Sequence, residues 1–225
     1  MARGIGPGMA IEPSLDLAAL IEGYRRFRGT GWAERRERWA ALRQGQEPRV
    51  MVIACADSRT DPAMVFDADP GEIFVVRNIA AMVPPFETNP GLHGVSAALE
   101  FAVQALHVRE IVIMGHGMCG GCKAALTREL HGAERGHGGF IADWISMLDE
   151  VRAPIAAELG TTGREAEQAM EHAAVKVSLA NLRTFPNVRA LEAEGKLRLR
   201  GAFFAISEGV LHLLDEESGE FAPVT

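Results

Sequence analysis

Short uncharged runs rich in β-branched residues alternate along the chain with longer segments whose apolar residues lie three or four positions apart. The runs at 50–54 and 111–114 lack a polar face, which predicts strands buried on both sides, as in a parallel sheet. In chain order, we assign the first strand to residues 49–54, the second to residues 72–77 after the turn residues 69–71, and the third to residues 110–115.

Helical spacing fills most of the remaining sequence. It predicts a helix between the second and third strands and three more after the third strand. A final alternating segment and the short apolar run after it predict a pair of edge strands. The helices are expected at 91–106, 121–130, 140–159 and 164–185, and the strand pair at 197–206 and 210–214. We therefore predict an α/β fold with a mostly parallel central sheet flanked by helices.

The N-terminal part of the chain differs from the rest. Residues 1–12 are rich in glycine and are expected to be a flexible N-terminus. Residues 13–45 predict a helical arm with few apolar positions, and residues 46–225 a single α/β domain. Such an arm is typical of a segment that packs against another surface.

Composition narrows the classes of partner. The 225 residues are 48% hydrophobic and 24% charged, as in an ordinary globular protein, with a formal net charge of −7. An acidic chain without a Lys/Arg run argues against nucleic acid and anionic membranes as partners. No segment has the length of a signal peptide or membrane span, and three cysteines do not make a disulfide framework, so a cytoplasmic location is expected.

Two clusters of reactive side chains follow the first and third strands. Cys55, Asp57 and Arg59 follow one, and His116 and Cys119 follow the other. Because ligands bind at the carboxyl ends of the strands in open α/β sheets, both clusters are expected at one edge. Two thiolates and one imidazole suit Zn²⁺, and three protein ligands leave a fourth position open, which favours a catalytic site.

Two further residues near these motifs need an interpretation. Asp57 and Arg59 can pair through two parallel hydrogen bonds, which would make the Asp an oriented acceptor beside the metal. Cys122 could form a redox pair with Cys119, but a small buried side chain on the following helix is the favoured interpretation.

These motifs, in this order and spacing, resemble the β-class carbonic anhydrases. The resemblance extends to residues 70–78 and 94–103, is close over 47–126 and is looser elsewhere. It implies an enzyme, a zinc lyase that hydrates CO₂ reversibly to bicarbonate with one Zn²⁺ per chain. It also implies that the 13–45 arm packs on a second subunit, in a homodimer or a dimer of dimers.

The resemblance assigns roles to individual residues. Cys55, His116 and Cys119 would bind the zinc, which lowers the pKa of its water to about 7. Asp57, held by Arg59, would accept a proton from the nucleophile and direct it at CO₂. The remaining positions concern the substrate. Gln46, which lies nine residues before Cys55, would reach across the dimer and bind oxygens of substrate or product together with the Gly120 N–H. An apolar wall would be formed by Phe74, Ile79 and Phe101.

Some family members close the site by moving the Asp onto zinc, with bicarbonate held by a Trp, an Arg and a Tyr. Here Arg77 occupies the Arg position, but Val52 and Phe204 occupy the other two. We therefore expect an open site with Asp57 on Arg59 and no bicarbonate regulation of that type.

Two alternatives remain open at the level of sequence. A β-class site behind a narrow apolar tunnel can hydrolyse CS₂ or COS instead of hydrating CO₂. A non-enzymatic zinc or thiol sensor using Cys119 and Cys122 is disfavoured because it gives Asp57 and Arg59 no role.

Overall fold

The computed structural model describes residues 16–224, so the predicted flexible segment at 1–12 lies outside the described residues. The chain divides into two compact units between Gly45 and Gln46. In the first unit, Asp16 begins helix α1 by accepting a hydrogen bond from the Ala19 N–H at 2.8 Å. The described residues of this unit form three helices: α1 (Leu17–Gly29), α2 (Gly31–Glu34) and α3 (Arg36–Leu42).

Helix α1 buries none of its residues within this chain. Its large apolar side chains are all exposed: Leu17, Leu20, Ile21, Tyr24 and Phe27. An amphipathic helix with an uncovered apolar stripe needs a second surface to bury it, as predicted for the arm.

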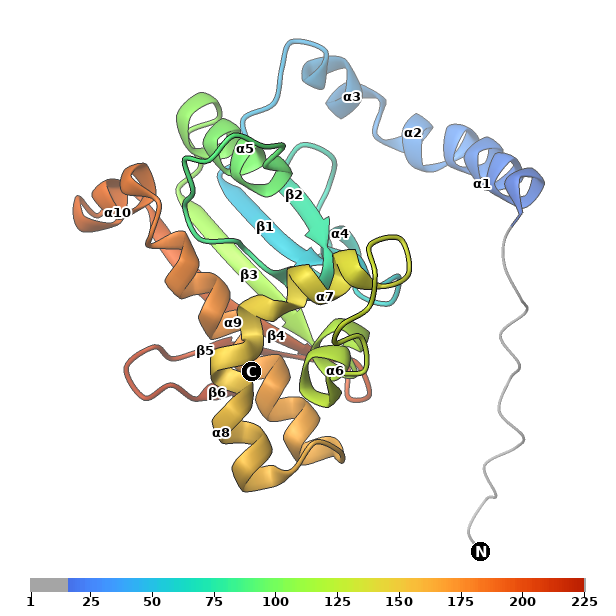
Figure 1. Cartoon of the computed structure of the whole chain (residues 1–225). Helices are drawn as coiled ribbons and strands as arrows, with labels where there is room; N and C mark the ends of the chain where they lie inside the picture. Colours follow the sequence, from blue (N-terminus) through green and yellow to red (C-terminus); the bar gives the residue numbers. More distant parts are fainter. Residues whose placement is uncertain (1–15, 225) are drawn as a thin grey trace, which may run out of the picture. The chain divides into compact units, whose positions relative to one another are not determined.

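The second unit is built on a six-stranded sheet with the order β2-β1-β3-β4-β5-β6 (Figure 1). The first four strands are parallel and the last two are antiparallel. This is the predicted α/β sheet with its C-terminal edge pair, and the short β6 was not predicted. The strands are β1 (Val50–Cys55), β2 (Ile73–Asn78), β3 (Glu110–His116), β4 (Arg198–Ala205), β5 (Val210–Leu214) and β6 (Phe221–Pro223).

The helices differ from the predicted segments mainly at their ends. The helix expected at 121–130 stops at Thr127 because Arg128 adopts a left-handed conformation with φ 57°. The segment expected at 140–159 changes pitch at 146–148, and a helix at 186–193, begun by Pro186, was not predicted. The helical elements are α4 (Pro62–Val65), η1 (Ile79–Ala81), α5 (Gly94–Glu100), η2 (Phe101–Ala105), α6 (Gly120–Thr127), α7 (Gly139–Ile145), η3 (Ser146–Leu148), α8 (Asp149–Leu159), α9 (Arg164–Leu182) and α10 (Pro186–Ala193).

The two faces of the sheet are covered unequally. Alternate residues of β1 point to opposite faces, so Met51 and Ile53 join the large core with α9, whereas Val52 and Ala54 join a much smaller cluster. Helix α9 contacts both β3 and β4. The main core therefore lies between the sheet and α9, which holds the carboxyl ends of the strands rigidly.

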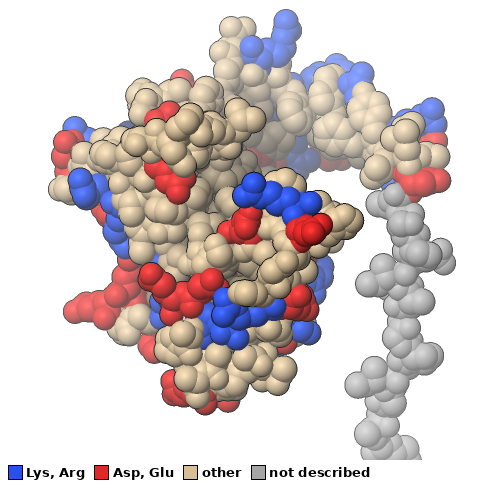
Figure 2. Space-filling view, in the orientation of Figure 1, with Lys and Arg blue, Asp and Glu red and all other residues tan. Residues whose placement is uncertain are grey.

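The charged side chains are mixed on the face shown in Figure 2, where acidic and basic groups lie close together. Within the described part of the chain, no helix has both the length and the apolar character needed to cross a bilayer.

Candidate metal centre

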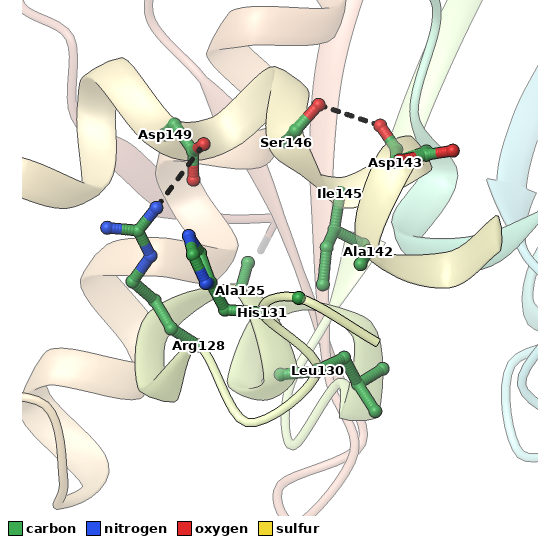
Figure 3. Close-up of a pocket in the computed structure, with 11 residues that line it drawn as sticks. Ala125, Arg128, Leu130, His131, Ala142, Asp143, Ile145, Ser146 and Asp149 are labelled. Atoms are coloured by element: carbon green, nitrogen blue, oxygen red, sulfur yellow. Dashed lines mark hydrogen bonds and ion pairs between the residues drawn. The ribbon is translucent and has the colours of Figure 1, made fainter. Parts of the chain in front are cut away.

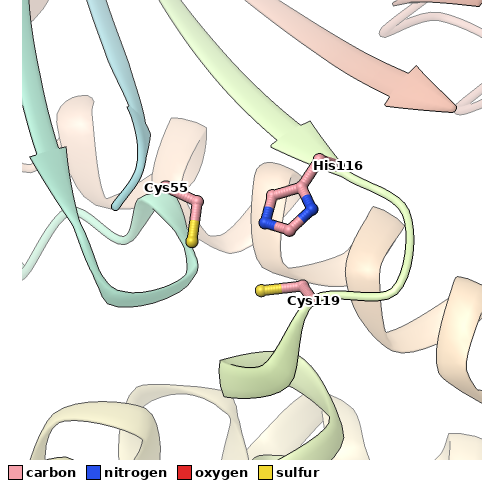
Figure 4. Close-up of side chains that lie close together, drawn as sticks. All are labelled: Cys55, His116 and Cys119. Atoms are coloured by element: carbon pink, nitrogen blue, oxygen red, sulfur yellow. The ribbon is translucent and has the colours of Figure 1, made fainter. Parts of the chain in front are cut away.

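Three potential metal ligands meet at the carboxyl edge of the sheet (Figure 4). Cys55 is the last residue of β1, His116 is the last residue of β3, and Cys119 is the N-cap of α6. Because β1 and β3 are parallel neighbours, their ends coincide, as the sequence predicted. The two sulfur atoms and one ring nitrogen lie within 4.8 Å of one another, and all three residues are buried. The predicted ligand set is therefore brought together.

The histidine is oriented for metal binding. Its Nδ1 lies 2.9 Å from the Gly117 carbonyl oxygen, and since a carbonyl only accepts, Nδ1 must carry the proton. This leaves Nε2 with a lone pair, and this buried atom has no hydrogen-bond partner among the residues the structure describes. A buried acceptor without a partner is unfavourable, whereas a neutral imidazole fixed through its other nitrogen is a typical zinc ligand. The donor set therefore fits Zn²⁺.

The two thiols hold their protons tightly in the metal-free chain. A hydrogen bond with Cys119 and then burial raise the pKa of the Cys55 thiol, and a hydrogen bond with Cys122 is the largest cause of the raised pKa of Cys119. Cys122 is buried on α6, as predicted. Zinc must displace these protons, because only the thiolate is a metal ligand.

Asp57 lies beside the three ligands and is held by Arg59. Arg59 Nε donates to Oδ1 at 2.9 Å, Nη2 donates to Oδ2 at 2.7 Å, and the Arg59 backbone N–H also donates to Oδ1. These hydrogen bonds keep the pKa of Asp57 well below its usual range, so the carboxylate is ionised at neutral pH. The expected pairing of Asp57 with Arg59 is present.

Arg77 fixes the loop that carries Cys55 and Asp57. Its Nε donates to the Cys55 carbonyl at 2.9 Å, its Nη2 donates to the Asp57 carbonyl at 2.6 Å, and its Nη1 pairs with Asp61 at 2.7 Å. All three nitrogens are thus engaged within the chain, and the expected lack of bicarbonate regulation stays a prediction. No sequence pattern predicts this structural role.

The predicted substrate residues do not all lie together within this chain. Phe74 on β2 is the sheet neighbour of Met51, which lies four residues before Cys55 on β1. The ring of Phe74 packs on that of Phe101, with the ring centroids 5.8 Å apart. Gln46 is exposed in the loop before β1. Gly120 begins α6, directly after Cys119. The substrate-binding roles of Gln46, Phe74, Phe101 and Gly120 stay predictions.

Ile79 lies in an apolar pocket that the sequence did not reveal. The Trp144 Nε1–H on α7 donates to the Ile79 carbonyl at 2.9 Å. This helix thereby brings its exposed apolar side chains to the segment after β2. The pocket, of about 480 Å³, is lined by Ala56, Asn78, Ile79, Phe140, Ile141 and Trp144.

A separate cavity of about 250 Å³ lies between α6, the following loop and the α7–α8 segment (Figure 3). It contains an Arg128–Asp149 ion pair at 3.9 Å and is also lined by His131. None of the metal ligands lines this cavity.

Comparison with known proteins agrees with this site. A family model described as carbonic anhydrase matches residues 50–211. A carbonic anhydrase of Pseudomonas aeruginosa is 35% identical over 207 residues, which cover 90% of this chain and 89% of that protein. The solved structure of the β-carbonic anhydrase CcaA is similar with a TM-score of 0.85 and 28% identity, over 92% of this chain and 99% of that one. A structure described as a tetrameric β-carbonic anhydrase of Sordaria macrospora has a TM-score of 0.77 and 30% identity, over 88% of this chain and 95% of that one.

Proposed function

The chain belongs to the β-class of the carbonic anhydrase family, and on that premise we propose that it catalyses the zinc-dependent, reversible hydration of CO₂ to bicarbonate and a proton. The observation that best supports this activity is the position of Asp57. Its Oδ2 lies 4.0 Å from His116 Nε2, the free ring nitrogen of the ligand set, while Arg59 holds the carboxylate. An ionised, oriented acceptor thus stands beside the metal ligands.

Cys55, His116 and Cys119 would hold the zinc, which would supply Lewis-acid activation of water as the nucleophile near neutral pH. Asp57 would accept a hydrogen bond from that nucleophile and orient it toward the carbon of CO₂. Arg59 prevents the carboxylate from turning, because two side-chain hydrogen bonds hold it in one plane.

The substrate needs an apolar surface and a few donors. Ile79 and the apolar α7 residues around it supply a surface of this kind. Gln46 and the Gly120 N–H are proposed to bind the oxygens of substrate and product, and Phe74 and Phe101 to extend the apolar wall. Since Gln46 is proposed to act across a dimer, these contacts require a second subunit.

Residues 13–45 are proposed to be the dimerisation arm and residues 46–225 the catalytic domain. The uncovered apolar stripe of α1 supports this role, as does the description of the Sordaria macrospora relative as tetrameric. We propose a homodimer or a dimer of dimers in the cytoplasm.

Stopped-flow measurement of CO₂ hydration by the zinc-loaded chain, from pH 6.5 to 9, tests the activity. His116→Ala is the matched control, because it removes one ligand and leaves Asp57 and Arg59 in place. We expect hydration by the wild type that is lost in the variant. Sulfide release from CS₂ or COS without CO₂ hydration would instead favour the alternative substrates. A zinc-loaded chain that catalyses none of these reactions would contradict an enzymatic role.

A further inference from the structure

The peptide group between Met118 and Cys119 is held at both ends by charged side chains. Arg59 Nη2 donates to the Met118 carbonyl at 3.0 Å, and the Cys119 N–H donates to Glu171 Oε1 at 3.1 Å. Both acceptor and donor belong to one planar unit, so the two contacts together fix its orientation. The Cα of Cys119 belongs to that plane, so the two contacts also fix the point from which the thiol side chain extends.

This peptide needs to be held, because the residue before it has an unfavourable backbone conformation. Met118 has φ 58°, in the left-handed region that L-residues adopt at an energetic cost. A turn of this kind persists where surrounding contacts enforce it. The contacts from Arg59 and Glu171 supply that enforcement on the loop between His116 and Cys119.

Glu171 is suited to act as a fixed anchor. Its side chain is 1% exposed, and it lies on α9, the helix that packs against β3 and β4. Arg164 donates to Oε1 through Nη1 at 2.9 Å and to Oε2 through Nη2. A buried carboxylate is stable only when its charge is paired and its oxygens are hydrogen-bonded, and Arg164 meets this need.

We propose that Glu171 is a positioning residue for the metal ligand Cys119, and that the two hydrogen bonds from Arg164 hold Glu171 in place. The inference rests on the zinc site of the proposed function and adds a partner outside its motifs. Because Arg59 holds both the Met118 carbonyl and Asp57, the same peptide also ties the Asp57–Arg59 pair to the position of the metal ligand.

Glu171→Gln tests the proposal, with Glu167→Gln as its matched control. Glu167 lies one turn earlier on α9 and faces the same Arg164 at 3.8 Å and Lys123 at 3.8 Å, whereas the Cys119 N–H donates to Glu171. We expect Glu171→Gln to release zinc to a chelator roughly 10- to 100-fold faster than the wild type. The thiolate-to-metal absorption of the cobalt-substituted protein should also shift, which a general loss of stability would not cause. Glu167→Gln should match the wild type in both measurements.

Arg164→Lys gives a second test if Glu171→Gln does not fold. It keeps the positive charge but loses the paired hydrogen bonds, so we expect a smaller acceleration of zinc release in the same direction. Wild-type release rates and cobalt spectra in the Glu171→Gln chain, or in Arg164→Lys if the former is unfolded, would overturn the proposal. Both measurements use the metal alone, so a chain that binds zinc but fails to hydrate CO₂ would contradict the proposed function and not this inference.

Discussion

Asp57 Oδ2 lies 4.0 Å from His116 Nε2, yet both oxygens of the carboxylate stay hydrogen-bonded to Arg59. The carboxylate is therefore close enough to the ligand set to contact whatever occupies the fourth metal position, while its own orientation is set by the guanidinium. The Asp57–Arg59 pairing is the one expected of an open site, and the open fourth position itself stays a prediction.

Asp57→Asn should keep its zinc and lose most of its turnover, by about 100-fold or more, because the amide presents a donor where a carboxylate accepts. Zinc content and stopped-flow hydration measured on one preparation separate binding from catalysis. Arg26→Gln, on the exposed arm helix, serves as a control that should leave both unchanged. Full turnover in Asp57→Asn would remove Asp57 from the mechanism.

The activity of the wild type should rise with pH along a single ionisation between pH 6.5 and 9. The pKa of Asp57 is depressed by its hydrogen bonds to Arg59, so Asp57 is ionised across this whole range and contributes no titration to it. Only the ionisation of the nucleophile remains. A steep, cooperative onset above about pH 8 would show instead that a carboxylate must be displaced from the metal first.

Cys55→Ser, His116→Ala and Cys119→Ser should each lose most of the zinc, whereas Cys122→Ser should keep it. The reason is that the first three side chains supply the atoms that lie within 4.8 Å of one another. Elemental analysis of the purified variants decides the matter. Loss of zinc in Cys122→Ser with full occupancy in Cys119→Ser would show that the other thiol is the ligand.

Zinc affinity should increase steeply with pH near neutrality. Since hydrogen bonding and burial raise the pKa of both ligand thiols above the usual value, each loses a proton when metal binds. Two released protons correspond to an affinity that rises roughly 100-fold per pH unit. Competition with a chelator at several pH values measures this slope. A slope near zero would mean that the thiols are already ionised in the metal-free protein.

His172 should make the fold less stable in mild acid. Its ring packs against both Phe203 and Phe221, and burial lowers its pKa to about 4. Between the unfolded pKa of about 6.5 and pH 4, the unfolded chain takes up a proton that the native chain refuses, so stability falls as pH falls. Urea unfolding at pH 7.5 and 5 should show it in the wild type and show less of it in His172→Phe.

Placing two acidic residues on the apolar stripe of α1, as Leu20→Glu with Ile21→Glu, should weaken the dimer. A charge in that stripe cannot be buried without a large desolvation penalty. Sedimentation measures the effect, with Arg26→Glu on the opposite side of the helix as the control. A wild type that sediments as a monomer at micromolar concentration would contradict the role of the arm and leave Gln46 without its proposed function.

The sequence by itself determined the parallel sheet and the identity of the metal-site residues. Strand runs without a polar face must be buried on both sides, and the ends of parallel neighbours coincide. Cys55 and His116 therefore had to meet as soon as their strands were assigned. The Asp57–Arg59 pair was predictable for a similar reason, because two residues of spacing bring a carboxylate and a guanidinium within reach.

Only the tertiary structure decided which distant residues support that site. Glu171 lies 52 residues after Cys119. The sequence predicted the helix that carries Glu171, but it did not predict that nearly the whole Glu171 side chain is buried. Arg77 and Trp144 likewise act through hydrogen bonds to backbone carbonyls elsewhere in the chain, Arg77 to two of them and Trp144 to one. Helical periodicity indicates which face of a helix is apolar, but the carbonyl or N–H group that a polar side chain meets depends on how whole elements pack. That packing is set by the sum of many weak apolar contacts, and no short stretch of sequence records it.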